Sequence, residues 1–296
     1  MGQPREYAPA LTWRAFFVAG LFAWLVPSTI QGQPGSTRMP DLAQVGLPDA
    51  VEAKLLLERF RAGGPRGDYY LEFELRSLPR RGAEVKFQGR LWGSRNERGA
   101  VSRVELIDES AKVHRWLLQN GPAPAVWILA GSQASILPAG SLLAPLIPGV
   151  DMSAFDLLMP YLFWPDFELK RIERIRGRPA HAYVFRPPPE FALAHPTVGW
   201  VRAYLDTQFN ALMQAERVGA DGRIQTTFAL GELKKIDEQW MIKSIDLRNE
   251  TTRDKTRFQV MALAMGVEFP TGTFEPARLN DEISAPRPER LFRLVP

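Results

Sequence analysis

Residues 68–78 read DYYLEFELRSL and residues 83–93 read AEVKFQGRLWG, and these two stretches decide the fold. In the first, Phe73 stands between Glu72 and Glu74, and apolar and charged residues alternate on either side of it. Successive side chains of a β-strand point to opposite faces of the sheet, so a period of two puts the apolar residues on one face. Both stretches are therefore predicted to be half-buried antiparallel strands.

The same pattern continues through most of the chain, interrupted by short polar, Gly or Pro turns. We count roughly ten to twelve strands, which is too many for a small flat sheet and suits a strongly curved or half-closed one. The fold class is therefore mainly β. The further predicted strands are 101–108, 112–120, 125–130, 167–177, 179–187, 201–208, 211–218, 224–233, 240–249 and 255–262.

The N-terminal segment has the layout of an export signal. Arg5 and Arg14 precede an apolar run over residues 15–26, and polar residues follow it. That run is too short to cross a bilayer as a helix, which takes about 20 residues. We predict a cleavable signal peptide over residues 1–32 and a periplasmic location. The alternative is an uncleaved anchor in the inner membrane.

The rest of the chain divides into three parts. Residues 33–48 are rich in Pro, Gly and small polar residues and are predicted to be a linker. Asp49 can cap a helix that starts a β domain over residues 49–275. Residues 276–296 are rich in Pro and charge and are expected to form a loosely attached tail.

An apolar segment, residues 138–165, interrupts the strands with PAGSLLAPLIPGVDMSAFDLLMPYLFWP. Its Pro and Gly spacing forbids long regular structure. Ser153 and Asp156 have the spacing of a helix-start capping pair, and Pro160 should shorten that helix. Such an apolar segment must lie against other apolar groups. Two interpretations stay open: a fixed plug in the concave face of the sheet, or a movable lid over a lipid-binding cleft.

Two stretches carry a resemblance to a known family. Residues 151–187 contain a short apolar helix that leads into a hairpin, and residues 201–260 contain a run of strands with ordered landmarks. Together they resemble the outer-membrane lipoprotein-sorting family. The landmarks are Tyr204, Asp206, Asp221-Gly222, Trp240, Ile242, Ile245 and Lys255-Thr256.

The resemblance implies an unclosed β-barrel covered by a few helices, in a carrier that moves acylated proteins across the periplasm. It implies lipoprotein acyl chains or other lipids as partners, and inner- or outer-membrane envelope proteins as further candidates. The family also uses an arginine to hold its lid closed. Arg90 lies in an early strand, but alternation puts it on the face opposite Phe87 and Leu91, so that role is not transferred to it.

The sequence thus predicts a non-catalytic carrier or binder of acyl chains that needs no cofactor. The alternative is an envelope regulatory or scaffold module that uses the same fold to bind a protein partner. The candidate site consists of inward-facing aromatic and aliphatic residues and of the segment that covers them. The cleft residues are Phe73, Phe87, Leu91, Trp127 and Tyr183, and the covering residues are Phe155, Leu158, Met159 and Trp164.

Composition argues against several other functions. Lys and Arg number 37 against 33 Asp and Glu, and both signs are interspersed, unlike the basic stripe of a nucleic-acid-binding protein. A basic group over residues 170–178 is read as a solvated strand, with an anionic-lipid contact as the lesser alternative. The chain has no cysteine, and its His114, His181 and His195 have no metal-ligand spacing.

Overall fold

The computed structural model describes residues 47–65, 67–236 and 239–294. The predicted signal peptide and most of the predicted linker lie outside these residues. Among the helices in the described ranges, none has the length and apolar content needed to cross a membrane.

The strands form one large antiparallel sheet of 14 strands, as the sequence predicted, and the sheet is not closed. Its order is β6-β5-β4-β3-β2-β1-β15-β14-β11-β10-β9-β8-β7, and β16 pairs with β15. A separate hairpin consists of β12 and β13. The strands are β1 Tyr69–Leu78, β2 Val85–Asn96, β3 Gly99–Ile107, β4 Val113–Gln119, β5 Ala125–Ala130, β6 Gln133–Ile136, β7 Phe167–Ile175, β8 Arg178–Phe185, β9 Val198–Asp206, β10 Leu212–Gly219, β11 Ile224–Leu230, β12 Leu233–Ile236, β13 Gln239–Ile242, β14 Ser244–Asn249, β15 Lys255–Met265 and β16 Phe292–Arg293.

The strand count exceeds the predicted one because three short strands were missed and one predicted strand is divided in two. The missed strands are β6 and β12, of four residues each, and β16, of two residues. The predicted strand 240–249 is divided at Lys243 into β13 and β14. Alternation over so few residues gives little signal above that of a turn.

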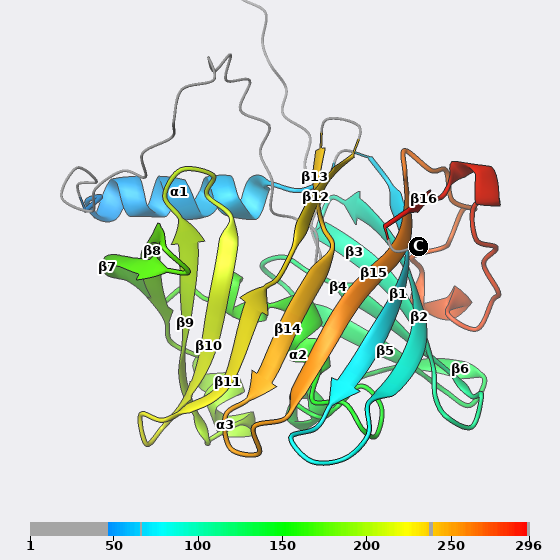
Figure 1. The fold of residues 1–296 in the computed structure, drawn as a ribbon, viewed down its shortest axis with the longest axis horizontal. Coiled ribbons are helices and arrows are strands. Elements are labelled where there is room, and N and C mark those ends of the chain that lie inside the picture. The colour runs from blue at the N-terminus through cyan, green and yellow to red at the C-terminus, as the bar shows by residue number, and fades with distance from the viewer. Residues whose placement is uncertain (1–46, 66, 237–238, 295–296) are drawn as a thin grey trace, which may run out of the picture.

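The order of the strands explains the position of the apolar segment. β6 and β7 follow one another in sequence, yet they are the two edges of the sheet. The chain between them must therefore cross the open side of the sheet. Figure 1 shows that the sheet bends around this segment, with α2 inside the bend. We call residues 138–165 the concave cover.

The helices are few and short. α1 begins after Asp49, whose carboxylate accepts hydrogen bonds from the Val51 and Glu52 amides, so the predicted helix start is confirmed. In Figure 1, α1 lies across one end of the sheet. The helices are α1 Ala50–Ala62, α2 Ala154–Leu158 and α3 Pro189–Ala194, with 3-10 turns η2 Ala139–Ser141, η3 Pro160–Phe163, η4 Pro276–Arg278 and η5 Pro288–Arg290.

The end of the chain packs against the outer face of the sheet. We call residues 266–294 the C-terminal strap. Arg103 of β3 is fully buried and donates hydrogen bonds to the carbonyl oxygens of Arg278, Leu279 and Asp281. The expectation of a loosely attached tail is therefore wrong, because a buried guanidinium needs these acceptors and holds the strap in place.

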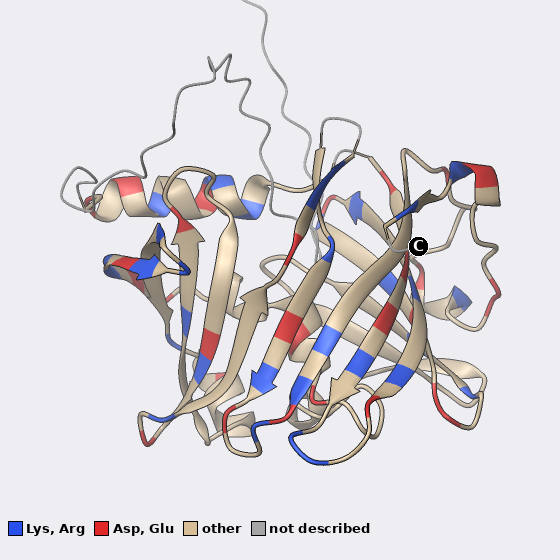
Figure 2. Ribbon diagram, viewed as in Figure 1, with Lys and Arg blue, Asp and Glu red and all other residues tan. Residues whose placement is uncertain are grey.

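The outer face of the strands not covered by the strap is charged. Figure 2 shows acidic and basic residues interspersed along β14, β15, β1 and β2. The Arg257 guanidinium, for example, bonds both oxygens of Asp246 at 2.6 and 2.9 Å. The sheet thus has a polar outer face and an apolar inner one.

Candidate ligand-binding site on the concave face

The concave face and its cover form one hydrophobic cluster. Eight of the nine predicted site residues lie in it, and all eight are buried. They are Phe73, Phe87, Leu91, Phe155, Leu158, Met159, Trp164 and Tyr183. Strand alternation predicted the sheet residues of this cluster. Helical spacing, with the position of Pro160, predicted the residues of the cover.

Trp127 is the ninth residue, and the structure places it elsewhere. It packs with Val101, Leu117 and Leu279 against the outer face, under the C-terminal strap. Its neighbours Val126 and Ile128 point into the concave cluster instead. β5 is apolar on both faces because both faces are covered, so alternation could not show which way Trp127 points.

The concave cover packs through aromatic side chains. The Phe155 ring lies 5.7 Å from Tyr161, 6.3 Å from Trp164 and 5.6 Å from Phe191 of α3, measured between ring centroids. Tyr161 in turn meets Phe185 of β8 at 5.9 Å, edge to face. These are favourable aromatic geometries.

The short helix of the cover is capped as predicted. The Ser153 hydroxyl accepts from the Asp156 amide, and the Asp156 carboxyl accepts from the Ser153 amide at 2.9 Å and from its hydroxyl at 2.6 Å. Met159 adopts a left-handed conformation, and a 3-10 turn starts at Pro160, so the helix ends after Leu158. Burial raises the pKa of the Asp156 carboxyl, although the Arg217 charge and the Ser153 bonds oppose that rise.

The backbone hydrogen bonds of the concave cover run within the cover. Examples are Leu146 to Met152, at 2.9 Å, and Phe155 to Leu142, at 3.1 Å. The sheet strands take no part in these bonds within the described chain. The cover can therefore leave the concave face without breaking the hydrogen-bond ladder of the sheet.

Side chains from four other parts of the chain hold the cover by single hydrogen bonds, and one of them is Asn249 of β14, which donates to the Asp151 carboxylate at 3.2 Å. Arg61 of α1 donates from Nε to the Leu162 carbonyl at 2.6 Å. Thr256 of β15 accepts from the Asp151 amide at 2.9 Å, and His195 Nε2 lies 2.9 Å from the Ala139 carbonyl. Arg61 also lies over the rings of Phe163 and Phe167, at 5.4 and 5.6 Å.

Sequence reasoning missed Arg61, Phe191 and His195. Arg61 lies at the C-terminal end of a helix far from the cover in sequence, and only the tertiary fold brings it to Leu162. Phe191 and His195 follow the Pro-rich residues 187–189, and no local pattern indicates that they reach the cover.

Beside Phe155 the concave face is filled. A cavity of about 10 Å³ remains between Phe155, Asp156, Tyr161 and Phe228. This is about the smallest space that holds one water molecule. An acyl chain could enter here only if the cover moved out.

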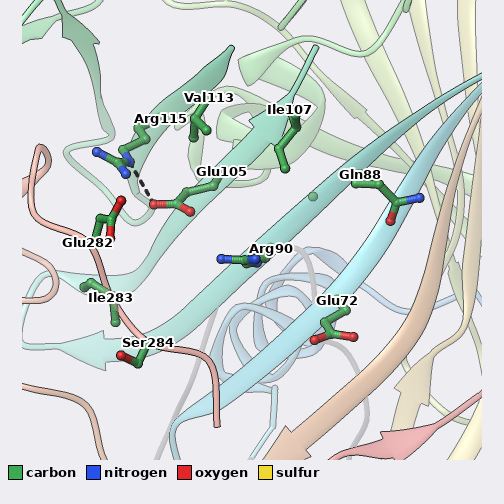
Figure 3. A pocket seen from close by; sticks show the side chains of 11 residues that line it. Glu72, Gln88, Arg90, Glu105, Ile107, Val113, Arg115, Glu282, Ile283 and Ser284 are labelled. Carbon is green, nitrogen blue, oxygen red and sulfur yellow. Dashed lines mark hydrogen bonds and ion pairs between the residues drawn. The ribbon is translucent and has the colours of Figure 1, made fainter. Parts of the chain in front are cut away.

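Arg90 does not face this site. It projects from β2 into a separate cavity of about 550 Å³ on the outer face, beside Glu72 and under Glu282 of the C-terminal strap (Figure 3). In the same cavity Arg115 donates to Glu105 at 2.8 Å. The sequence analysis was therefore correct to leave Arg90 out of the concave face.

We also searched the described residues for metal-ligand clusters. Among the described residues, no group of three or more His, Asp or Glu side chains could hold a metal ion. The described concave face is apolar, and its buried carboxyl, Asp156, is engaged in helix capping.

Solved structures provide the decisive comparison. An outer membrane lipoprotein-sorting protein domain from Vibrio parahaemolyticus superposes with a TM-score of 0.64 over 78% of this chain and 97% of its own, at 14% identity. The chain has the fold of the lipoprotein-sorting proteins. A LolA superfamily protein from Nitrosomonas europaea gives 0.57 over 75% and 96%, at 17% identity.

A third structure widens the comparison. A DUF1329 family protein from Desulfovibrio piger superposes with a TM-score of 0.66 over 78% of this chain and all of its own, at 15% identity. No family model and no curated protein matches the sequence itself. The lipoprotein-sorting fold is thus shared at low identity, with the predicted unclosed sheet.

Proposed function

We propose that this protein is a non-catalytic carrier or binder of acyl chains in the cell envelope, with lipoproteins or other acylated molecules as its ligands. One observation carries the proposal: the concave cover fills an apolar sheet face while its backbone bonds stay within itself. The lipoprotein-sorting fold supports it. The site would consist of the predicted residues of the concave cluster, without Trp127.

A bound acyl chain would replace the apolar contacts that the cover makes with the sheet. Lifting the cover exposes the apolar groups of the sheet to water, at about 25 cal/mol per Å². An acyl chain that takes its place restores this burial, so the open state is stabilised only when ligand is present. The sheet ladder stays intact throughout.

A second candidate function rests on the filled face beside Phe155. If the cover is a permanent plug, the fold serves as an envelope regulatory or scaffold module that binds a protein partner. The two candidates differ in one property, namely whether the cover opens.

A reversible crosslink tests this property. The Asp151 amide lies 2.9 Å from the Thr256 hydroxyl, and the chain has no cysteine, so D151C/T256C introduces a single thiol pair between cover and sheet. We expect the oxidised variant to lose uptake of a triacylated cysteine peptide. Reduction should restore it.

The single variants D151C and T256C serve as controls for the substitutions themselves. Equal uptake by oxidised and reduced protein would exclude opening of the cover as the binding step. Absence of uptake by wild type and by every variant would favour the scaffold function.

A further inference from the structure

A second apolar cavity lies at the rim of the sheet, away from the concave cover. Its volume is about 490 Å³, within the usual range for small-molecule sites of about 300–1,000 Å³. The β7–β8 turn, the β9–β10 turn and the β12–β13 hairpin enclose it. Phe209, Met213, Leu230, Leu233 and Trp240 provide its apolar wall.

The cavity occupies a split in the sheet. β10 begins at Leu212, but its pairing with β11 begins only at Gln214, opposite Ala229. β11 then ends at Leu230, and the following strand, β12, pairs with β13. The hairpin therefore leaves the plane of the sheet, and the space between it and β10 is the rim cavity.

Two large aromatic side chains at this cavity are open to solvent. Trp240 is 44% exposed and Phe209 is 42% exposed. Exposed large apolar groups gathered at a hollow mark a binding surface more often than single scattered ones do.

The two arginines at the cavity mouth differ in whether a carboxylate compensates their charge. Arg178 is neutralised, since its Nε donates to Asp206 at 2.6 Å and its guanidinium lies 4.9 Å over the Phe209 ring. Arg176 donates to the Leu230 carbonyl, which fixes it at the mouth. Among the described residues no carboxylate forms an ion pair with Arg176. Its remaining donors and its full charge are available to an anion.

We propose that this rim cavity binds a single-chain amphiphile with an anionic head, as a monomer. The chain lies against Phe209, Met213 and Trp240, and the head bonds to the Arg176 guanidinium. A guanidinium fork matches a carboxylate or a phosphate equally well, so both head groups fit. The site is separate from the concave face and does not require its cover to open.

Titrations with paired probes test the site. A dansylated fatty acid and its uncharged primary amide, both below their micelle concentrations, are titrated into wild type and into oxidised D151C/T256C, whose concave cover is closed. Arg176→Gln removes the charge, and Trp240→Ala removes the wall. Arg174→Gln, an exposed arginine two residues away, and Leu193→Ala, 86% exposed on α3, are the matched controls.

In the oxidised crosslinked background, we expect Arg176→Gln to weaken binding of the acid about tenfold, the effect of one charge-assisted hydrogen bond, and to leave the amide unchanged. Trp240→Ala should weaken both probes, and the control variants should match wild type. Thermal melting verifies that each variant is folded. The acid should still bind the oxidised crosslinked protein, whatever the crosslink does at the concave face.

Three results would each overturn the proposal. The first is equal binding of acid and amide by wild type. The second is unchanged binding by both Arg176→Gln and Trp240→Ala, or no binding by wild type. The third is binding to vesicles that contain phosphatidylglycerol without binding of the monomeric acid, which would make the rim a membrane contact instead.

Discussion

The two faces of the sheet are covered in different ways. The concave cover packs through aromatic and aliphatic groups and is held by single hydrogen bonds to the side chains of Arg61, Thr256, His195 and Asn249. The C-terminal strap on the outer face is held by the buried Arg103, which donates to three of its carbonyl oxygens.

The difference bears on function. Apolar contacts are not directional, so a ligand chain can replace those of the concave cover. A buried guanidinium cannot lose its acceptors without a large desolvation cost, so the strap must stay. We therefore propose that the concave cover is exchangeable and that the strap is permanent.

The largest expected effect contrasts two phenylalanines of the concave cluster. Phe73→Ala removes a ring that stacks on Phe258 at 4.3 Å within the sheet, and it should cost about 3–5 kcal/mol of unfolding free energy. Phe155→Ala in the cover should cost only about 1–2 kcal/mol, because the loss cannot exceed the free energy of opening the cover. Denaturant midpoints measure both values.

Binding of a fluorescent triacylated cysteine peptide provides the second measurement on these variants. Phe155→Ala should raise it, since the closed state loses packing. A loss of 3–5 kcal/mol in Phe155→Ala, with no probe binding in wild type or variant, would make the cover a fixed plug.

The next effect concerns the strap. Arg103→Met removes three hydrogen bonds to carbonyl oxygens of the strap, at about 1 kcal/mol each, so stability should fall by about 3 kcal/mol. Arg98→Met, on the exposed turn that precedes β3, should change stability by less than about 0.5 kcal/mol. Similar midpoints for the two variants would contradict a strap held by Arg103.

The sequence pattern predicted the inner face of the sheet better than the outer face, because the two faces are covered by different parts of the chain. Alternation placed Phe73 and Phe87 correctly because charged or polar residues flank each of them in sequence. It placed Tyr183 correctly next to the small residue Ala182. It failed for Trp127, whose outward side chain is covered by Leu279, about 150 residues later in the chain.

The prediction of a loosely attached tail was wrong for a related reason. Its Pro and charge content suggested a loose tail, but Leu279 and Ile283 reach apolar patches of the outer face. Arg103, in a strand whose other residues are apolar or small apart from Glu105, was a local hint that something covers that face. The acceptors for it could not be identified without the fold.

A smaller effect is expected at the contact between α1 and the cover. Arg61→Met removes the hydrogen bond to Leu162, at a cost of about 1–2 kcal/mol, and should increase uptake of the triacylated peptide. Arg59→Met, exposed on the same helix, is the matched control. Unchanged uptake in Arg61→Met would mean that this contact does not hold the cover closed.

The smallest effect is a pH dependence. Burial raises the pKa of Asp156, so the folded protein binds that proton more tightly than the unfolded chain does. This contribution to stability is complete below the unfolded value of about 3.9 and is lost as pH rises through the higher folded value. Asp156→Asn keeps an acceptor for Ser153 and should remove this part of the profile.

The difference between the wild-type and Asp156→Asn profiles isolates this group, because the buried His181, whose pKa burial lowers, contributes equally to both. Denaturant midpoints from pH 4 to pH 8 provide the profiles. If wild type instead loses stability relative to Asp156→Asn as the pH falls, Asp156 is charged in the folded protein.

Hydrogen–deuterium exchange of the wild-type protein, followed by mass spectrometry with and without a triacylated cysteine peptide, tests the central claim most directly. Amides of residues 154–163 in the concave cover should exchange faster when the ligand is bound, because the cover has left the sheet. Amides of residues 276–291 in the strap should be unaffected. Unchanged exchange in the cover at saturating ligand, or equal acceleration in cover and strap, would contradict the account.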